Sequence, residues 1–283
     1  MSDLAAKTGS AGGVHAAGSG ETMRVAWLYP EHLNIYADRG NLLLLDRRCA
    51  WRGLGFEVTP VGLGDTLDAG AHDVYYLGGG QDRDQARCAA DLVATKRDAL
   101  AAAAERGATI LGICGGYQLL GHEYELGTER IPGVGLLDLR TVRGSGRLIG
   151  DVEITVDLPR VDGSTTGPTA LAGFENHGGR TLLGDEQPLG TVVHGHGNDG
   201  ASGAEGARRG NIIGTYLHGP LLPKNVWFAD ELIARAVGVV PGELAQLDDR
   251  LEDAAHASAR RAATRSAPSH SPVARLRAKL GRG

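Results

Sequence analysis

The stretch LGICGGYQLL, residues 111–120, joins an apolar run to a short helical segment through a cysteine held between glycines. ATILGIC (108–114) predicts a buried strand that ends at Cys114. The pattern Gly112-x-Cys114-x-Gly116 is typical of a nucleophile elbow, in which glycines remove Cβ clashes where the chain turns sharply from strand to helix. We therefore interpret Cys114 as a nucleophile and not as a buried core cysteine.

Two further expectations follow from a sulfur at a helix N-terminus. The helix dipole and the free N–H groups there lower the pKa of a thiol and so favour the thiolate. The N–H of Gly115 is placed to donate to a tetrahedral oxyanion. A second donor is predicted in the glycine loop LGGGQD (77–82), from Gly79 or Gly80, because this loop also ends a strand.

The segments around the elbow alternate between strand and helix patterns. Strands are expected at 24–30, 56–63, 73–80 and 108–114, with helices at 40–55 and 82–107. This rhythm predicts an α/β fold with a mostly parallel, flavodoxin-like sheet flanked by helices.

The second half of the chain has a different pattern. From GVGLLDL to GTVVHGHG the expected strands are short, alternating and separated by glycine-rich turns, which predicts a mixed or antiparallel extension of the sheet. Residues 197–211 are expected to form a flexible loop, 212–220 a strand with a turn, 223–238 a capped helix, and 241–264 a peripheral amphipathic helix. We expect residues 1–22 to form a flexible tail, 23–240 the catalytic domain, and 241–283 a peripheral helix with a basic tail.

A thiolate in acyl transfer needs a general base, and histidines were compared for this role. His218, in GTYLHGP, ends a predicted strand and so is expected at the same sheet edge as Cys114, with His177 in FENHGGR as the second choice. His194 and His196 share a strand face but have no third ligand at matching spacing, so no metal site is predicted. His122 is interpreted as structural.

Composition limits the function classes. Apolar residues make up 42% of the 283-residue chain, enough for a sizeable core, and its three cysteines show no CxxC spacing. The N-terminus has neither a signal-peptide pattern nor an apolar run long enough to cross a bilayer, so a cytoplasmic protein is expected. The net charge is −5, and the segment from Arg260 onward has seven basic residues and no acidic one, so the rest of the chain is more acidic still, which argues against nucleic-acid binding by the body.

Four stretches together carry a resemblance to a known family. GICGGYQLLG, GTYLHGP, LGGGQDRDQA and FENHGGRT resemble the class I glutamine amidotransferases on the cobyric-acid-synthase-like branch. LYPEHLNIYADRGNLLLL, FENHGGRT and the LPKN that follows the histidine are similar, more narrowly, to the GatD family, the glutaminase subunits of lipid II isoglutaminyl synthase. The resemblance extends over about residues 24–240.

The resemblance implies a specific chemistry. Cys114 would attack the side-chain amide of L-glutamine and release ammonia, His218 would shuttle the proton, and water would hydrolyse the thioester to glutamate. Gln118 matches the motif position beside the substrate. Arg147, in SGRLIGDV, matches the family's substrate-binding arginine, and its guanidinium suits the α-carboxylate of glutamine.

The sequence departs from the wider class at one position. Many class I glutaminases have a glutamate two residues after the histidine, where this chain has Pro220. Two explanations remain open. Either a Cys–His dyad is sufficient, or a partner subunit supplies the carboxylate that orients His218.

A partner is also expected because amidation of a carboxylate requires its activation, normally by ATP. The chain has no G-x-x-x-x-G-K-[ST] phosphate loop, and none of its four lysines follows a glycine. We therefore expect no cofactor in this chain, with ATP and Mg²⁺ on the partner. The resemblance implies a Mur-ligase-like (MurT-like) synthetase in a heterodimer, which amidates the D-glutamate α-carboxylate of lipid II at the inner face of the membrane.

Three alternatives remain open. The first is a glutaminase for another synthetase of the cobyrinate type, although cobyric acid synthases carry a fused ATP-binding domain for which we expect no room here. The second is a non-catalytic scaffold that binds a ligase. The third is a cysteine peptidase that uses Cys114 and His218.

Overall fold

A computed structural model describes residues 21–35 and 38–266 of the chain. Most of both expected tails, residues 1–20 and 267–283, lies outside these ranges. The helical segments are α1 (Arg39–Trp51), α2 (Asp82–Asp91), the π-helical η1 (Leu92–Lys96), α3 (Arg97–Glu105), α4 (Gly115–Leu120), α5 (Leu221–Lys224), α6 (Val226–Ala236), the 3₁₀ turn η2 (Pro241–Glu243) and α7 (Arg250–Ser266). None of these helices has the length and apolar composition needed to cross a bilayer.

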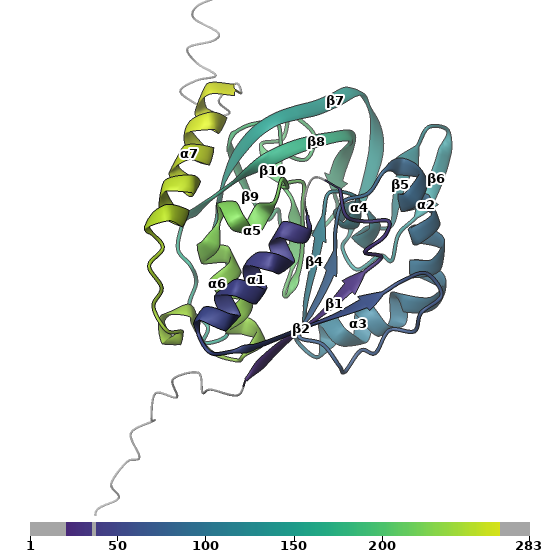
Figure 1. Ribbon diagram of the computed structural model, residues 1–283. Coiled ribbons are helices and arrows are strands. Elements are labelled where there is room, and N and C mark those ends of the chain that lie inside the picture. Colours follow the sequence, from purple (N-terminus) through teal and green to yellow (C-terminus); the bar gives the residue numbers. More distant parts are fainter. Residues whose placement is uncertain (1–20, 36–37, 267–283) are drawn as a thin grey trace, which may run out of the picture.

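The first sheet is built almost entirely from parallel strands. Its order is β11 (Ala207–Arg209), β12 (Ile212–Thr215), β4 (Thr109–Ile113), β3 (Val74–Leu77), β1 (Thr22–Leu28) and β2 (Gly55–Val61), with only β11 antiparallel to its neighbour. Helices α1 and α6 lie on one side of this sheet and α2 and α3 on the other (Figure 1). Right-handed crossovers require this arrangement. The chain passes from β1 through α1 to β2 at one edge of the sheet, and from β3 through α2 and α3 to β4 in the direction of the other edge. The predicted fold class is confirmed.

The strands between residues 123 and 205 form a sheet of their own beside the first, and of the strands in the second half only β11 and β12 join the first sheet in the described part of the chain. The order is β10 (Ala204–Glu205), β9 (Gly190–His194), β7 (Leu139–Val156), β5 (Glu123–Leu126) and β6 (Glu129–Pro132), and β8 (Thr169–Leu183) also pairs with β7. The long antiparallel β7–β8 pair shifts register between Arg143 and Leu148. This shift leaves residues 144–147 outside the ladder, so the local backbone bends as at a β-bulge.

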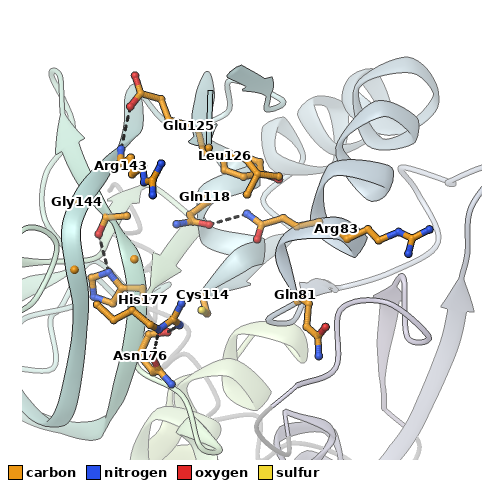
Figure 2. Close-up of a pocket in the computed structure, with 18 of the residues that line it drawn as sticks. Gln81, Arg83, Cys114, Gln118, Glu125, Leu126, Arg143, Gly144, Asn176 and His177 are labelled. Carbon is orange, nitrogen blue, oxygen red and sulfur yellow. Dashed lines mark hydrogen bonds between the residues drawn. The ribbon is translucent and has the colours of Figure 1, made fainter. Parts of the chain in front are cut away.

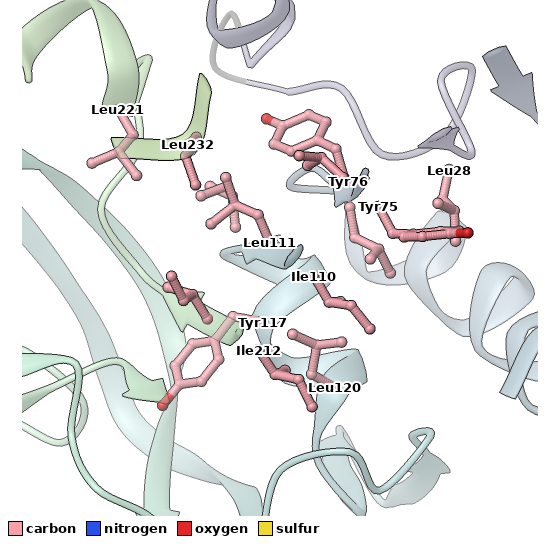
Figure 3. Packing of buried hydrophobic residues seen from close by; sticks show 14 of the residues in the cluster. Leu28, Tyr75, Tyr76, Ile110, Leu111, Tyr117, Leu120, Ile212, Leu221 and Leu232 are labelled. Atoms are coloured by element: carbon pink, nitrogen blue, oxygen red, sulfur yellow. The ribbon is translucent and has the colours of Figure 1, made fainter. Parts of the chain in front are cut away.

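The core of the first sheet lies where β3, β4 and β12 meet the helices. Tyr75, Ile110 and Leu111 are at most 1% exposed, and they pack among residues from α4, α5 and α6 (Figure 3). The strands are therefore buried on both faces, as expected of a parallel sheet covered by helices. A site on this sheet is therefore expected at the loops that follow its strands.

Three predictions for individual elements need correction. The helix expected at 82–107 is interrupted by η1, where the buried Lys96 pairs with Asp91 and lies over the Tyr29 ring. The expected loop at 197–211 contains the short strands β10 and β11. The side chain of Asn225, at the start of α6, does not cap that helix, because it bonds to the backbone N–H and C=O of Ala172 on β8.

The C-terminal helix is attached to the body through charged side chains. Arg260 of α7 pairs with Glu153 of β7 at 2.8 Å. The segment before α7 is anchored by the fully buried Arg48 of α1, which binds both Asp249 and Asp230 of α6. A guanidinium with two carboxylate partners tolerates burial that an unpaired charge would not.

Candidate active site

The predicted elbow is present at the end of β4. Cys114 joins β4 to α4 with φ 52° and ψ −104°, and its N–H donates to the Thr215 carbonyl at 2.8 Å. A Cβ on Gly112 would lie 2.9 Å from the Gly116 backbone, and one on Gly116 would lie 2.3 Å from the Leu77 carbonyl. Both glycines are therefore required for the close approach of strand and helix.

Cys114 lines a pocket, although its side chain is only 8% exposed. The pocket has a volume of about 860 Å³ and is also lined by Gly80, Gln118, Arg147 and His177. Figure 2 shows Gln118 and His177 beside Cys114. Its walls come from both sheets. The sulfur is accordingly accessible to a small ligand while the surrounding protein limits contact with bulk water.

The glycine loop after β3 lies directly against Cys114. The N–H groups of its glycines differ in whether they are already bonded within the protein. A Cβ on Gly79 would lie 3.4 Å from that of Cys114. The Gly79 N–H donates to Asp38 Oδ2 at 2.7 Å, and the Gly79 carbonyl accepts from Ile35 at 3.1 Å. The Gly79 N–H is therefore already bonded within the protein. Of the two donors predicted from this loop, Gly79 is not available to an oxyanion.

Gly80 remains as the candidate donor from this loop. Its nitrogen lies 3.1 Å from the point that a Cβ on Gly115 would occupy, so the amides of Gly80 and Gly115 are close neighbours beside Cys114. Two adjacent backbone N–H groups next to a nucleophile form the arrangement that stabilises an oxyanion.

Arg147 is fixed in the opposite wall of the pocket. It stands in the register shift of β7, and its Nε and Nη2 donate to the side-chain and main-chain oxygens of Asn176 on β8, both at 2.7 Å. With these two groups engaged, Nη1 and the second hydrogen on Nη2 remain to bind a carboxylate end-on. Asn176 was not singled out from the sequence, although the FENHGGR motif contains it.

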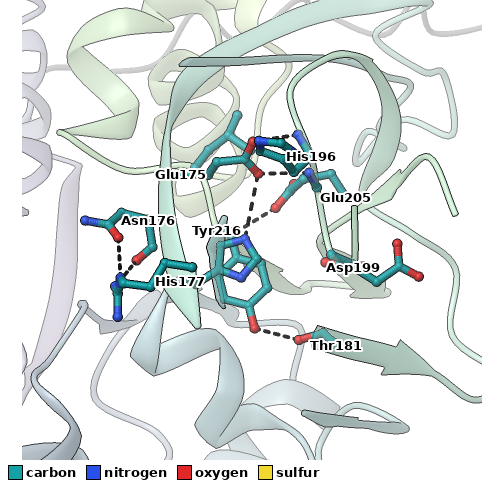
Figure 4. Close-up of polar contacts among 12 residues, drawn as sticks. Glu175, Asn176, His177, Thr181, His196, Asp199, Glu205 and Tyr216 are labelled. Atoms are coloured by element: carbon teal, nitrogen blue, oxygen red, sulfur yellow. Dashed lines mark hydrogen bonds and ion pairs between the residues drawn. The ribbon is translucent and has the colours of Figure 1, made fainter. Parts of the chain in front are cut away.

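Gln118 is held by a chain of polar side chains. Its Oε1 accepts from Gln85 at 2.6 Å, and its Nε2 donates to the Tyr216 hydroxyl at 3.1 Å. That hydroxyl also bonds to Thr181 Oγ1 at 2.6 Å (Figure 4). The amide of Gln118 therefore has a fixed orientation in the pocket wall. Gln85, Tyr216 and Thr181 stand in the stretches that carry the family resemblance, but no single stretch shows that they meet at Gln118.

His218 lies at the same edge of the first sheet as Cys114. Strand β12 pairs with β4, with Thr215 opposite Ile113, and His218 follows three residues later in a two-bond bridge to Phe174. The side chain is fully buried and is not among the residues that line the pocket. Burial, together with the positive charge of Lys224, lowers the pKa of His218 to about 4, so the imidazole is neutral at pH 7 and able to accept a proton.

His177, the second choice for the base, does line the pocket, but its imidazole is held by neighbours. The ring stacks on Tyr216 with centroids 3.6 Å apart, and Nδ1 donates to the Gly179 carbonyl at 2.9 Å. Its Nε2 faces the buried Glu175 carboxylate at 3.7 Å (Figure 4). These contacts fit a wall residue better than a group that moves protons to and from Cys114.

Comparison with known proteins agrees with this geometry. Residues 24–226 match the CobB/CobQ-like glutamine amidotransferase domain. The subunit GatD of lipid II isoglutaminyl synthase (glutamine-hydrolyzing) from Staphylococcus aureus strain N315 is 38% identical over 226 residues, which is 78% of this chain and 88% of that protein. The corresponding subunit from Streptococcus pneumoniae strain R6 is also 38% identical, over 80% of this chain and 84% of that protein.

Two further matches cover less of the chain or share less of its sequence. A cobyric acid synthase from Rhodococcus jostii is 41% identical, but over only 44% of this chain and 22% of that protein. A solved structure, PurLQS from Thermotoga maritima, shares the fold with a TM-score of 0.52 at 22% identity, over 76% of this chain and 95% of that one. With the match to the whole amidotransferase domain and to GatD along most of its length, the chain belongs to the CobB/CobQ-like glutamine amidotransferases and, among them, to the GatD family.

Proposed function

We propose that this chain is the glutamine-hydrolysing subunit of a lipid II isoglutaminyl synthase. Its relatives of nearly full length carry that name, and Cys114 stands in a strained elbow between two backbone amides and a fixed arginine. The elbow at the mouth of a pocket that also contains Arg147 is the observation that carries the proposal.

The reaction begins with the α-carboxylate of L-glutamine bound end-on by Arg147. His218 takes the proton of the Cys114 thiol, the thiolate attacks the amide carbon, and the N–H groups of Gly80 and Gly115 hold the resulting oxyanion. Collapse of the tetrahedral intermediate breaks the C–N bond, and the nitrogen leaves as ammonia with a proton delivered by His218. His218, again neutral, then takes a proton from the water that cleaves the thioester to glutamate and the free thiol.

The ammonia is used by a second subunit. We assign to that subunit, a Mur-ligase-like synthetase, the ATP and Mg²⁺ sites and the activation of the D-glutamate α-carboxylate of lipid II. The pair would work at the inner face of the membrane, where the lipid-linked acceptor is exposed.

The test is an amidation assay with lipid II, ATP and the co-purified synthetase, in which glutamine or ammonium supplies the nitrogen. The wild type is expected to use both sources, and Cys114→Ala to use ammonium only. Continued use of glutamine by Cys114→Ala would contradict the assignment of the nucleophile. Amidation of cobyrinate-type carboxylates in place of lipid II would favour the alternative partner.

A further inference from the structure

The segment that follows β1 contains a carboxylate with an unusual placement. Asp38 is the residue immediately before α1, a position where aspartate commonly accepts a hydrogen bond from the first turn of its own helix. Here its side chain makes no such cap, is 1% exposed, and turns toward the glycine loop after β3. A buried carboxylate that gives up its usual local bond requires another explanation.

The contact that Asp38 makes instead is with the peptide beside the nucleophile. Oδ2 accepts the Gly79 N–H at 2.7 Å, across 41 residues of sequence. The same oxygen lies 3.2 Å from the point where a Gly79 Cβ would stand, and Cys114 Cβ lies 3.4 Å from that point. Asp38 and Cys114 therefore border the same peptide of the loop.

The remaining bonds of the loop show what this contact determines. The Gly78 carbonyl accepts from Gly116 of the elbow helix at 3.1 Å, and the Gly79 carbonyl accepts from Ile35 at 3.1 Å. Asp38 holds the N–H of the Gly78–Gly79 peptide, and Ile35 holds the carbonyl of the Gly79–Gly80 peptide, so the peptide planes on both sides of Gly79 are fixed. The Gly80 N–H belongs to the second of these peptides, so its orientation is set as well.

We propose that Asp38 is a positioning residue of the oxyanion hole: by accepting the Gly79 N–H, it fixes the glycine loop so that the Gly80 N–H points at the oxygen of the tetrahedral intermediate on Cys114. This inference rests on the proposed acyl-transfer function and adds a residue to it. Glycines allow the loop its close approach but leave it three flexible residues, so an external anchor is needed. Burial raises the pKa of Asp38 to about 7, a cost that a purely structural acceptor such as asparagine would avoid.

The experiment uses two reagents that differ in their need for an oxyanion hole. p-Nitrophenyl acetate acylates the Cys114 sulfur through a tetrahedral oxyanion and expels p-nitrophenolate. Iodoacetamide alkylates the same sulfur by direct displacement of iodide, with no charge developing on an oxygen. Both are used on the chain with its co-purified synthetase, beside steady-state glutamine hydrolysis, and Cys114→Ala gives the background.

The variants are Asp38→Ala, Asp38→Asn and Asn34→Ala. Asn34 is the matched control, because its Oδ1 accepts the Arg39 N–H at 3.1 Å in the same segment without touching the glycine loop. Asp38→Ala is expected to lower kcat for glutamine and the acylation rate by about 100-fold, the usual effect of losing one oxyanion donor. Asp38→Asn is expected to lower both about tenfold, because a neutral acceptor holds the amide less strongly than a carboxylate.

In both Asp38 variants, KM for glutamine and the iodoacetamide rate should stay within about twofold of the wild type, and Asn34→Ala should match the wild type throughout. Either folded Asp38 variant with wild-type acylation would overturn the inference, as would a parallel fall of acylation and alkylation, which indicates a collapsed elbow. If Asp38→Ala does not fold, Asp38→Asn decides alone. A wild type that is acylated but does not hydrolyse glutamine would contradict the proposed function. In that case the role of Asp38 is still decided by comparing the acylation rates of the wild type and the Asp38 variants.

Discussion

Cys114, the proposed nucleophile, has a backbone conformation that residues with a side chain rarely adopt. A positive φ of 52° at a residue with a Cβ costs on the order of 1–3 kcal/mol, and the bonds of Cys114 to Thr215 and of Gln118 to Cys114 hold it there. The strain aims the sulfur away from the sheet and into the pocket. The backbone conformation that places the Cys114 sulfur in the pocket therefore lowers the free energy of unfolding.

That strain can be measured by comparing two inactive variants. We predict that Cys114→Gly is more stable than Cys114→Ala by about 1 kcal/mol, because glycine adopts positive φ without a Cβ clash while losing more chain entropy on folding. Urea unfolding of both proteins at one pH gives the difference. An alanine variant equal to or more stable than the glycine variant would show that the elbow is relaxed.

The second residue-scale prediction concerns the anchor of Arg147. Asn176→Ala removes the side-chain oxygen that holds Nε, so we expect KM for glutamine to rise about tenfold with kcat within about twofold, as for lost ground-state binding. Arg147→Ala should raise KM at least as much, and the double variant should match Arg147→Ala. Additive effects in the double variant would show that Asn176 does not act through the guanidinium.

The residues that the sequence revealed differ in kind from those it did not. Cys114 and Gly115 belong to one continuous motif, so their chemistry is readable from a short stretch. Asp38 contacts Gly79, and Tyr216 contacts Gln118 across 98 residues, so these partners depend on which strands become neighbours. Local patterns predict strand ends but not the pairing between them.

At the scale of elements, the second sheet places substrate-binding side chains opposite the elbow. The register shift in β7 removes residues 144–147 from the ladder and lets Arg147 bond to Asn176 on β8. Alternating hydrophobicity indicated strands here, but it does not encode a bulge, which depends on the register of two strands. The pattern therefore predicted strands here, but short ones, whereas β7 and β8 have 18 and 15 residues. Arg147 was expected only from the family resemblance, and neither source gave the geometry.

Strands β10 and β12 are joined by a buried carboxylate that gives a pH-dependent prediction. Glu205 is fully buried and accepts from Thr215 Oγ1 at 2.9 Å and from the Tyr216 N–H at 2.7 Å. Burial raises its pKa from 4.5 to about 8. The folded state thus holds a proton that the unfolded state has released, and this stabilisation is lost as the pH rises from about 4.5 through 8.

We predict that Glu205→Gln, which keeps an acceptor without the titration, gains stability relative to the wild type as the pH increases. The gain between pH 5 and pH 9 should reach about 4 kcal/mol at most, by the linkage of pKa to stability. Denaturant unfolding of both proteins across this range measures it, with the exposed Glu129→Gln as control. A difference that does not change with pH would show that Glu205 is ionised in the folded protein over the whole range.

At the scale of the whole molecule, the site lies where the strand order of the first sheet reverses. The segment containing Asp38 follows β1, and the glycine loop follows the adjacent β3. Ligands of open α/β sheets bind at this point, beyond the carboxyl ends of the strands. The second sheet completes the pocket, so the proposed nucleophile, oxyanion donors and substrate-binding arginine all come from one chain.

Two explanations remain open for the third catalytic group: a Cys–His dyad is sufficient, or a partner subunit supplies a carboxylate that orients His218. Pro220 stands two residues after His218, where many class I glutaminases have a glutamate. Under the second explanation we predict that the isolated chain hydrolyses glutamine at least about tenfold more slowly than the complex with its synthetase, because a carboxylate bonded to the imidazole stabilises its protonated form. Equal rates from the isolated chain would show that Cys114 and His218 are sufficient.

The most direct test of the nucleophile is mass spectrometry of the chain after treatment with the diazo-ketone analogue of glutamine. The thiolate displaces nitrogen from this reagent and forms a stable thioether. We predict one adduct, on Cys114, that excess L-glutamine prevents and that leaves the buried Cys49 and Cys88 unlabelled. A folded protein with no adduct on Cys114, or with labelling that glutamine does not prevent, would contradict the assignment of this cysteine to glutamine hydrolysis.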